Sequence, residues 1–350
     1  MNLPLNGTLS RLASDDLAEV SRFLRETWQH QYGAASYPAF STSYLGWLYG
    51  GPHENDTILL GVRAAGRLVA FKALLFRPLL VQGQPRRSHV LTHLAVDPSL
   101  PLSDRVAALG AITAAQFCEH PFEGPDARTG DEGGTLDTLI AFYDDKKGYH
   151  RSTDSIYAQA GFTRSKIPFQ HAIVSPRRVE MNLIRGSAEV PGIEVRPALI
   201  AEAALIARLF NQVARQHTVA LAVTPAWVQH HMFGLVDSRV YLALESGVPT
   251  GFVSCYALDT LSGDSIRRVV VIEYLIVGGT AATAPALMAP AVQFSNEQGA
   301  KGVVIENATY LDPEVYTRAG MLPSTRRMVG ALGSRREDVS PSDGMLIDIK

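Results

Sequence analysis

The sequence predicts an α/β protein in which one domain, built on a mixed sheet, occurs twice in tandem. Three observations support this prediction. The 350 residues correspond to about two domains at ~150 residues per domain. Apolar runs of strand length alternate with segments of helical periodicity, in the same order in both halves. Short sequence fragments also recur at a nearly constant spacing along the chain.

The first half begins with a helix expected over residues 15–28, where Leu17, Val20, Phe23 and Leu24 recur at helical spacing. Two extended runs joined by a short turn that contains Gly66 then indicate a hairpin. The expected elements from the hairpin onward are two strands, a third strand, a helix, a fourth strand, a short helix and a final strand, over residues 57–63, 68–78, 89–96, 103–118, 135–143, 152–160 and 162–174.

The second half repeats this order after Gly192. The expected elements are a helix, a pair of strands, a third strand, a helix, a strand, a short helix and a closing strand, over residues 198–216, 240–245, 250–258, 268–277, 284–298, 302–306, 312–319 and 328–332. Each copy is therefore expected to form a central, mostly antiparallel sheet flanked by helices.

The spacing between matching fragments shows that the halves are copies of each other. Gly66 and Phe71 match Gly247 and Phe252, and both pairs are 181 positions apart. The tripeptides at 94–96 and 275–277 have the same spacing. Such a period is far too long for a solenoid and indicates a duplicated domain.

A later match has a shorter spacing. The segment around Tyr157, which ends at Gly161, matches the segment around Tyr316, 159 positions further on. An insertion in the polar, Gly-rich loop 119–134 of the first copy explains the difference. We therefore expect an N-terminal domain over residues 1–180, a C-terminal domain over 190–335 and a tail over 336–350. The apolar residues 345–347 leave open that this tail ends in a docked strand.

Composition excludes several classes of protein. Lys plus Arg number 32 and Asp plus Glu number 34, for a net charge of −2, which predicts no broad contact with nucleic acid or an anionic membrane. The two cysteines, Cys118 and Cys255, form no disulfide framework, and metal-ligand spacings are absent from the sequence. The N-terminal residues do not read as a secretory signal, and no apolar run reaches the ~18 residues of a membrane span. We expect a cytoplasmic protein without a metal.

The order of elements in each copy resembles the GNAT superfamily of N-acyltransferases. The residues that carry the resemblance are the run 91–96 followed by Asp97 and Pro98, then a helix, then the segment from Tyr157 to Phe162. The arrangement of two copies is similar to tandem members of that superfamily, including N-myristoyltransferase. The resemblance implies that one half carries coenzyme A and that the other half shapes the site of an amine acceptor.

The resemblance also implies where an acyl-coenzyme A donor binds. In the superfamily, the central strand splays from its neighbour to admit the pantetheine arm, and the following turn holds the pyrophosphate at a helix N-terminus, where free N–H groups favour an anion. The corresponding residues here are Leu94, Ala95 and Val96 on the strand, and Leu102, Ser103, Asp104, Arg105 and Val106 in the turn. This turn departs from the superfamily pattern because it has no glycine and carries Asp104. Ser103 is also a candidate helix N-cap.

Two residues are candidates for acid–base chemistry. The resemblance makes Tyr157 the general acid that protonates the leaving thiolate, although Tyr316 occupies the same place in the other copy and a core tyrosine is an alternative. Glu273 interrupts an apolar strand, where a carboxylate is costly unless it is paired or faces a wet cleft. It is a candidate general base or amine-binding group, the alternative being an ion pair with Arg267 or Arg268.

Other polar and aromatic residues are weaker candidates. Packing is the favoured explanation for the histidines His89 and His93, and for a possible acceptor-pocket set: Tyr44, Trp47, Tyr49, His230 and His231. The sequence thus predicts an acyl-coenzyme A-dependent N-acyltransferase, which moves an acetyl or longer acyl group to an amine of a small molecule or peptide by direct attack. The alternatives are the same enzyme with the roles of its halves reversed, and a non-catalytic acyl-coenzyme A-binding or scaffold protein.

Overall fold

The computed structural model describes most of the chain. The described residues are 7–33, 36–116, 138–144, 158, 163–174, 192–279, 282–307, 310–312, 314, 321–334 and 345–347. Tyr157, Tyr316, Cys118 and the expected loop 119–134 lie outside them.

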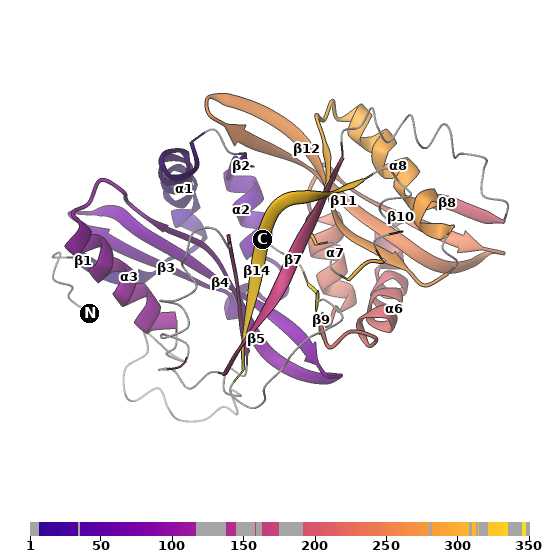
Figure 1. Cartoon of the computed structure of the whole chain (residues 1–350), viewed down its shortest axis with the longest axis horizontal. Coiled ribbons are helices and arrows are strands. Elements are labelled where there is room, and N and C mark those ends of the chain that lie inside the picture. Colours follow the sequence, from indigo (N-terminus) through magenta and orange to yellow (C-terminus); the bar gives the residue numbers. More distant parts are fainter. Residues whose placement is uncertain are drawn as a thin grey trace.

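Six α-helices flank the strands in the part of the chain that the structure describes (Figure 1). The helices of the first half are α1 (Leu17–Tyr32), the short, eight-residue α2 (Thr42–Tyr49) and α3 (Leu102–Gln116). Those of the second half are α6 (Ala203–Ala214), α7 (Pro225–Phe233) and α8 (Thr283–Glu297). The strands of the first half are β1 (Gly7–Arg11), β2 (Tyr37–Pro38), β3 (Ile58–Ala64), β4 (Arg67–Val81), β5 (Gln84–Val96), β6 (Thr138–Asp144) and β7 (Thr163–Val174). Those of the second half are β8 (Ile193–Pro197), β9 (Val219–Leu221), β10 (Ser238–Glu245), β11 (Val248–Ser262), β12 (Ser265–Val277), β13 (Val303–Ile305), β14 (Leu322–Ser334) and β15 (Met345–Leu346).

The strands form one mixed sheet of 15 strands that runs through both halves. Its main path is β1-β3-β4-β5-β6-β14-β7-β13-β12-β11-β10-β8. Neighbours on this path are antiparallel except for the pairs β5–β6 and β12–β13, which are parallel. This architecture confirms the fold class expected from the sequence.

The two halves exchange their last long strands at the centre of the sheet. β14 of the second half pairs with β6 of the first, and β7 of the first half pairs with β13 of the second. Between them β7 and β14 pair with each other, and Figure 1 shows them side by side in the middle of the molecule. The sheet therefore does not divide at one point of the chain, and the expected domain boundaries at 180–190 and 335 stay a prediction.

The element bounds confirm the repeat and its spacing. β4 and β11 begin at Arg67 and Val248, which are 181 positions apart, and their last residues have the same separation. The same spacing relates β5 to β12 and α3 to α8 at both ends of each element. The arithmetic from the sequence thus aligns the central strands and the helix after them residue by residue.

The hairpin turns of the two copies also share one backbone geometry. Ala65 and Gly66 have φ values of 49° and 76°, and their equivalents Ser246 and Gly247 have 52° and 79°. Two consecutive residues with positive φ form the turn that matches the twist of a two-residue hairpin. The glycine at the second position takes this conformation without the steric cost of a Cβ.

Three hydrophobic clusters hold the sheet between its helices. One lies beneath α3 and includes Ala108, Ile112 and Leu139. A second lies beneath α8 and includes Leu287 and Phe294. The third and largest cluster joins both halves on the opposite face of the sheet, where α1, α2, α6 and α7 contribute buried side chains.

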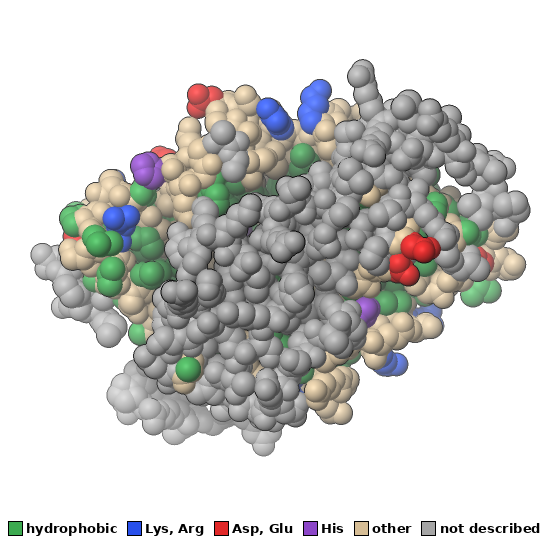
Figure 2. All heavy atoms as spheres, in the orientation of Figure 1, with side chains coloured by type: hydrophobic (Ala, Val, Ile, Leu, Met, Phe, Trp, Pro, Cys, Tyr) green, Lys and Arg blue, Asp and Glu red, His purple; other side chains and the backbone are tan. Residues whose placement is uncertain are grey.

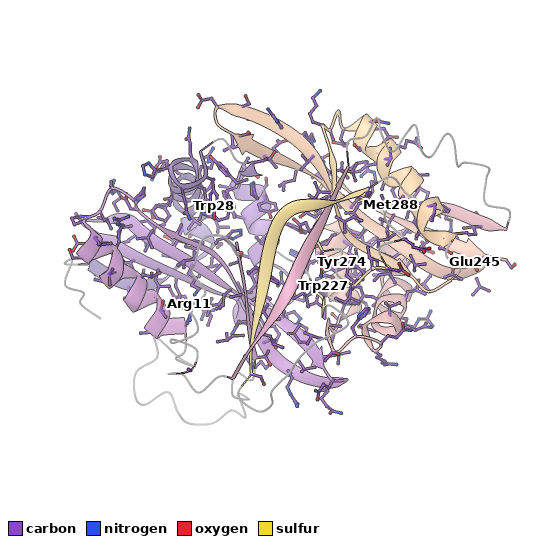
Figure 3. All side chains as sticks on the ribbon, in the orientation of Figure 1. Arg11, Trp28, Trp227, Glu245, Tyr274 and Met288 are labelled. Carbon is purple, nitrogen blue, oxygen red and sulfur yellow. The ribbon has the colours of Figure 1, made fainter. Side chains whose placement is uncertain are left out.

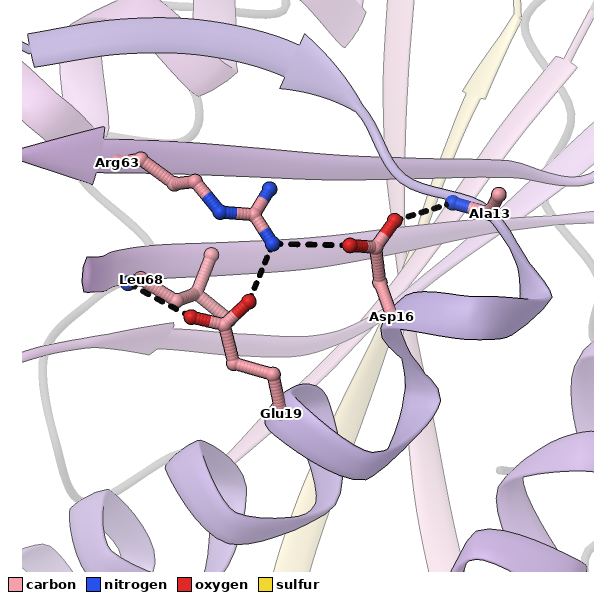
Figure 4. Close-up of polar contacts among 5 residues, drawn as sticks. All are labelled: Ala13, Asp16, Glu19, Arg63 and Leu68. Carbon is pink, nitrogen blue, oxygen red and sulfur yellow. Dashed lines mark hydrogen bonds and ion pairs between the residues drawn. The ribbon is translucent and has the colours of Figure 1, made fainter. Parts of the chain in front are cut away.

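Ion pairs fix the start of α1 against the edge of the first half (Figure 4). Arg63 of β3 donates to Asp16 at 2.9 Å and to Glu19. Glu19 also accepts a hydrogen bond from the Leu68 N–H at 3.2 Å, and Asp16 accepts one from the Ala13 N–H at 2.8 Å. These contacts set the register of α1 on the hairpin of β3 and β4.

Several elements differ from those expected. The first helix is shifted to Leu17–Tyr32, and the helix expected from residue 103 begins one residue earlier, at Leu102. The short helices α2 and α7 were not predicted. Within the expected tail, Met345–Leu346 pair with β9, which is the docked strand that the sequence left open. Among the described helices, none is both long and apolar enough to cross a bilayer.

Candidate active site

The strand β5 parts from its neighbour β6 near its carboxyl end. The parallel pairing runs only from Ser88–Thr138 to Leu91–Ala141. Beyond this point β5 continues to Val96 beside β4, while β6 continues to Asp144 beside β14. The segment 94–96, expected to bind the donor, therefore lies where the two strands diverge. There the backbone groups of β5 are not paired with β6.

A β-bulge lies at the same level of β5. The register with β4 changes from Ala73–Thr92 to Phe71–Ala95, so that two residues of β5 oppose Lys72 alone. His93 takes a φ of 54° there, a conformation that few non-glycine residues adopt. Bulges re-aim the backbone of one strand, and strained positions of this kind cluster at functional sites.

A buried hydrogen bond holds His93 in this conformation. The Tyr49 hydroxyl and His93 Nδ1 are 2.7 Å apart, and the imidazole ring also contacts the rings of Trp28 and Phe40. Burial lowers the pKa of His93 to about 3 and raises the pKa of Tyr49 well above its usual value. Both groups are therefore neutral at physiological pH, and the buried contacts of His93 agree with the packing role favoured from the sequence.

A tight turn connects β5 to α3. The Asp97 carboxylate accepts hydrogen bonds from the N–H and the hydroxyl of Ser99, at 2.9 and 2.6 Å, and from Arg67 at 2.8 Å. The Pro101 carbonyl accepts from the N–H groups of Asp104 and Arg105, both at 3.0 Å. The turn is thus built without glycine, because an aspartate side chain closes it.

The first residues of α3 are those expected to face the phosphates. Because the helix begins at Leu102, its first N–H groups have no intrahelical acceptor. Ser103 lies inside the first turn, so its expected role as N-cap is wrong. Arg105 is half-buried, and its Nε has no hydrogen-bond partner among the described residues. Leu102 and Val106 are 68% and 61% exposed, and hydrophobic side chains are visible over this end of the molecule in Figure 2.

In the C-terminal half the parallel pairing ends at the equivalent level, because the short strand β13 stops there. The parallel pairing of β12 with β13 ends at Ile272–Ile305, and a bulge follows, in which Glu273 is the extra residue. The Glu273 side chain is almost fully buried. Beyond it, the Leu275 N–H donates to the Tyr310 hydroxyl at 2.9 Å. Burial and, secondly, the negative charge of Glu273 raise the pKa of Tyr310.

The start of α8 corresponds to the start of α3. Here the Thr283 hydroxyl donates to the Glu245 carboxylate at 2.5 Å. A carboxylate at a helix N-terminus is favoured by the helix dipole. The C-terminal copy therefore has a negative side chain where the N-terminal copy has Ala64, 181 positions before Glu245.

The short helix α2 contacts both halves of the chain. Trp47 Nε1 donates to the His230 carbonyl at 3.1 Å, and His230 Nε2 donates to the Trp47 carbonyl at 2.8 Å. The Trp47 ring also packs on Tyr256 of β11, with centroids 5.2 Å apart. Two turns of one helix thus contact the bulge of the first half, through Tyr49, and the core of the second half, through Trp47.

The structure does not bring the two expected catalytic residues, Tyr157 and Glu273, together at β5. Tyr157 lies outside the described residues. Glu273 lies on β12, and the strands β6, β14, β7 and β13 separate it from β5 along the sheet. Arg268, one expected partner of Glu273, donates instead to Asp237. Cys255 is a buried core residue, and burial raises the pKa of its thiol to about 12.

Comparison with solved structures identifies the architecture. An N-myristoyltransferase of Saccharomyces cerevisiae with bound myristoyl-CoA and inhibitors superposes with a TM-score of 0.70, over 98% of this chain and 85% of that chain, at 13% identity. A tandem GNAT protein from the clavulanic acid biosynthesis pathway gives a TM-score of 0.62, over 95% of this chain and 99% of that chain, at 17% identity. The chain has the tandem GNAT fold.

A further solved structure and two sequence comparisons bear on the same assignment. A GCN5-related N-acetyltransferase from Kribbella flavida gives a TM-score of 0.52, over 93% of this chain and 70% of that chain, at 14% identity. No family model and no curated protein matches the sequence. The tandem GNAT assignment therefore depends on structure, and it confirms the resemblance seen in the sequence. In the described residues there is no cluster of three or more metal-binding side chains.

Proposed function

We propose that this protein is an acyl-coenzyme A-dependent N-acyltransferase with its donor site in the N-terminal half. The observation that carries the proposal is the divergence of β5 from β6 beyond Leu91, next to a bulge and followed directly by the start of α3. Solved proteins of this fold include acyltransferases, and one of them contains myristoyl-CoA. Acyl-coenzyme A is accordingly the proposed donor.

The donor would be held by backbone groups at two places. N–H groups of Leu94–Val96 would face the thioester and pantetheine arm, and a donor aimed at the thioester oxygen stabilises the charge that develops there. The N–H groups of Leu102 and Ser103, together with Arg105, would face the pyrophosphate. Asp104 lies in the same turn of α3, and its charge opposes phosphate binding.

The reaction would be a direct transfer. The amine nitrogen of the acceptor attacks the thioester carbonyl carbon, the C–N bond forms and the C–S bond breaks. The leaving thiolate takes a proton from the Tyr157 hydroxyl, or from Tyr316 if the halves act in reversed roles. The amine gives up its proton to water. If the halves act in reversed roles, the donor lies beside β12, and Glu273 is the proposed carboxylate that takes this proton.

The C-terminal half would supply the acceptor site. The largest hydrophobic cluster is continuous between the halves, and α2 contacts both. The acceptor is an amine of a small molecule or of a peptide. A cytoplasmic location stays part of the proposal.

A non-catalytic acyl-coenzyme A-binding protein is the second candidate. The observation that favours it is the turn at 97–104, which is closed by Asp97 rather than by glycine and adds Asp104 next to the phosphate site. A cofactor site with this charge would bind the donor weakly.

Two measurements test the proposal. Melting temperature is recorded with acetyl-, short-chain and long-chain acyl-coenzyme A, and free thiol is measured over a panel of amines. We expect stabilisation by at least one thioester and amine-dependent thiol release, which Tyr157→Phe reduces. Stabilisation without thiol release supports the binding protein, and no shift with any thioester contradicts both.

A further inference from the structure

We propose that side chains of the C-terminal half occupy both coenzyme A positions of that copy, so that the chain binds one donor and binds it in the N-terminal half. The two residues are Tyr310 at the strand opening and Glu245 at the start of α8. The inference rests on the proposed function and deepens it, because it names the residues that decide which half takes the donor.

The first position is the opening between β12 and β13. The Leu275 N–H donates to the Tyr310 hydroxyl at 2.9 Å, and the same hydroxyl lies 3.5 Å from the Leu275 carbonyl. Both backbone groups of this residue therefore point toward one phenol oxygen. The equivalent of Leu275 in the first copy is Leu94, 181 positions earlier.

This contact also indicates what Leu94 would bind. An oxygen atom accepts the hydrogen bond of Leu275. In both copies the parallel pairing ends three residues before this position, at Leu91 and at Ile272, and a bulge lies next to it. By equivalence, the ligand atom at Leu94 is an acceptor oxygen, which a thioester or amide carbonyl of acyl-coenzyme A provides. The Leu94 side chain is 42% exposed, whereas that of Leu275 is fully buried.

The second position is the N-terminus of α8. The Glu245 carboxylate accepts a hydrogen bond from Thr283, the first residue of the helix, at 2.5 Å. Figure 3 shows Glu245 at the end of the molecule that carries α8 and β8. A carboxylate there takes the place favourable for an anion, and it repels the phosphates of a nucleotide.

The N-terminal copy lacks this carboxylate. Ala64 is the equivalent of Glu245, and Leu102 is the equivalent of Thr283. Both Ala64 and Glu245 are the last residues of their strands, and they pair with equivalent residues, Arg67 and Val248. At these matched positions the Glu245 side chain therefore fills the N-terminus of α8, whereas Ala64 places no carboxylate at the N-terminus of α3.

The test transfers the carboxylate to the first copy. Ala64→Glu is compared with Ala64→Gln, which has the same size without the charge, by titrating acetyl-CoA in a calorimeter. We expect one site per chain in the wild type, an affinity at least tenfold weaker in Ala64→Glu, and an affinity within about threefold of wild type in Ala64→Gln. Equal affinities in the two variants overturn the proposal.

The reciprocal test opens the second copy. In the double variant Glu245→Ala/Tyr310→Ala we expect the stoichiometry to rise from one toward two acetyl-CoA per chain. A stoichiometry that stays at one in a folded double variant, or two sites in the wild type, contradicts the inference. If the wild type binds no acyl-coenzyme A, the proposed function fails instead, so the two failures are distinct. Circular dichroism shows which variants are folded.

Discussion

The hydrogen bond between Tyr49 and His93 gives a prediction whose size can be worked out from the structure. Tyr49→Phe removes only the hydroxyl, which lies 2.7 Å from His93 Nδ1, and keeps the ring that packs on Phe71. Both side chains are buried, at 5% and 6% exposure, so water cannot replace the lost partner. A buried polar atom left without a partner costs about 1–3 kcal/mol.

The assay is unfolding in urea at pH 7.5, where His93 is neutral. We expect Tyr49→Phe to lower the free energy of unfolding by about 1–3 kcal/mol, with an unchanged dependence on urea concentration. The matched control is Tyr37→Phe, because the Tyr37 hydroxyl is buried with no hydrogen-bond partner among the described residues. A loss in Tyr49→Phe no larger than the loss in Tyr37→Phe would refute the account of the bulge.

Three further predictions concern buried and charged groups. Burial lowers the pKa of Lys72 to about 7 from 10.5. Between these pH values the unfolded chain holds a proton that the folded protein does not, so the free energy of unfolding should rise with pH by up to ~1.4 kcal/mol per pH unit. In Lys72→Met, unfolding curves recorded over this range should show a weaker dependence of stability on pH. Arg63→Met removes the contact that joins β3 to Glu19 and should lower the free energy of unfolding by about 1–2 kcal/mol. A change below ~0.3 kcal/mol would contradict this expectation, because it is the size expected for an isolated surface ion pair. The hydrogen bonds from Arg196 lower the pKa of Glu202 to about 2 from 4.5. The Glu202 carboxylate therefore stabilises the folded protein above pH 4.5, and this contribution is lost as the pH falls toward 2. Glu202→Gln should cost about 0.5–1 kcal/mol at pH 7 and nothing at pH 2, as measured by thermal melting at both values.

The sequence predicted the repeated core because local patterns determine it. The strands β4, β5, β11 and β12 are long apolar runs joined by glycine turns, and both α3 and α8 follow at the same spacing. By contrast, α2 has buried side chains at five of its eight positions, so it shows no polar face and no helical period.

Pairing between distant segments could not be predicted in the same way. β7 and β14 each follow their own half in the sequence, yet each pairs with a strand of the other half. Nothing in the local composition of a strand specifies a partner that lies 129 to 196 positions away in the sequence. The shared centre of the sheet was therefore not foreseen.

The candidate site was partly predictable. The repeat spacing located Leu94 and the start of α3, and the same arithmetic would have aligned Glu245 with Ala64. Tyr310 was missed because it follows β13, in the region where the spacing between copies changes and no equivalent residue can be assigned. The role of Tyr49 depends on α2, which the pattern did not reveal.

Hydrogen–deuterium exchange of the wild-type protein, with and without acyl-coenzyme A, tests the central claim most directly. We expect slower exchange in peptides that cover residues 92–104, the end of β5 and the start of α3, and no change in peptides that cover 272–284. Protection of the C-terminal peptides alone, or of neither region at saturating ligand, would contradict a donor site in the N-terminal half.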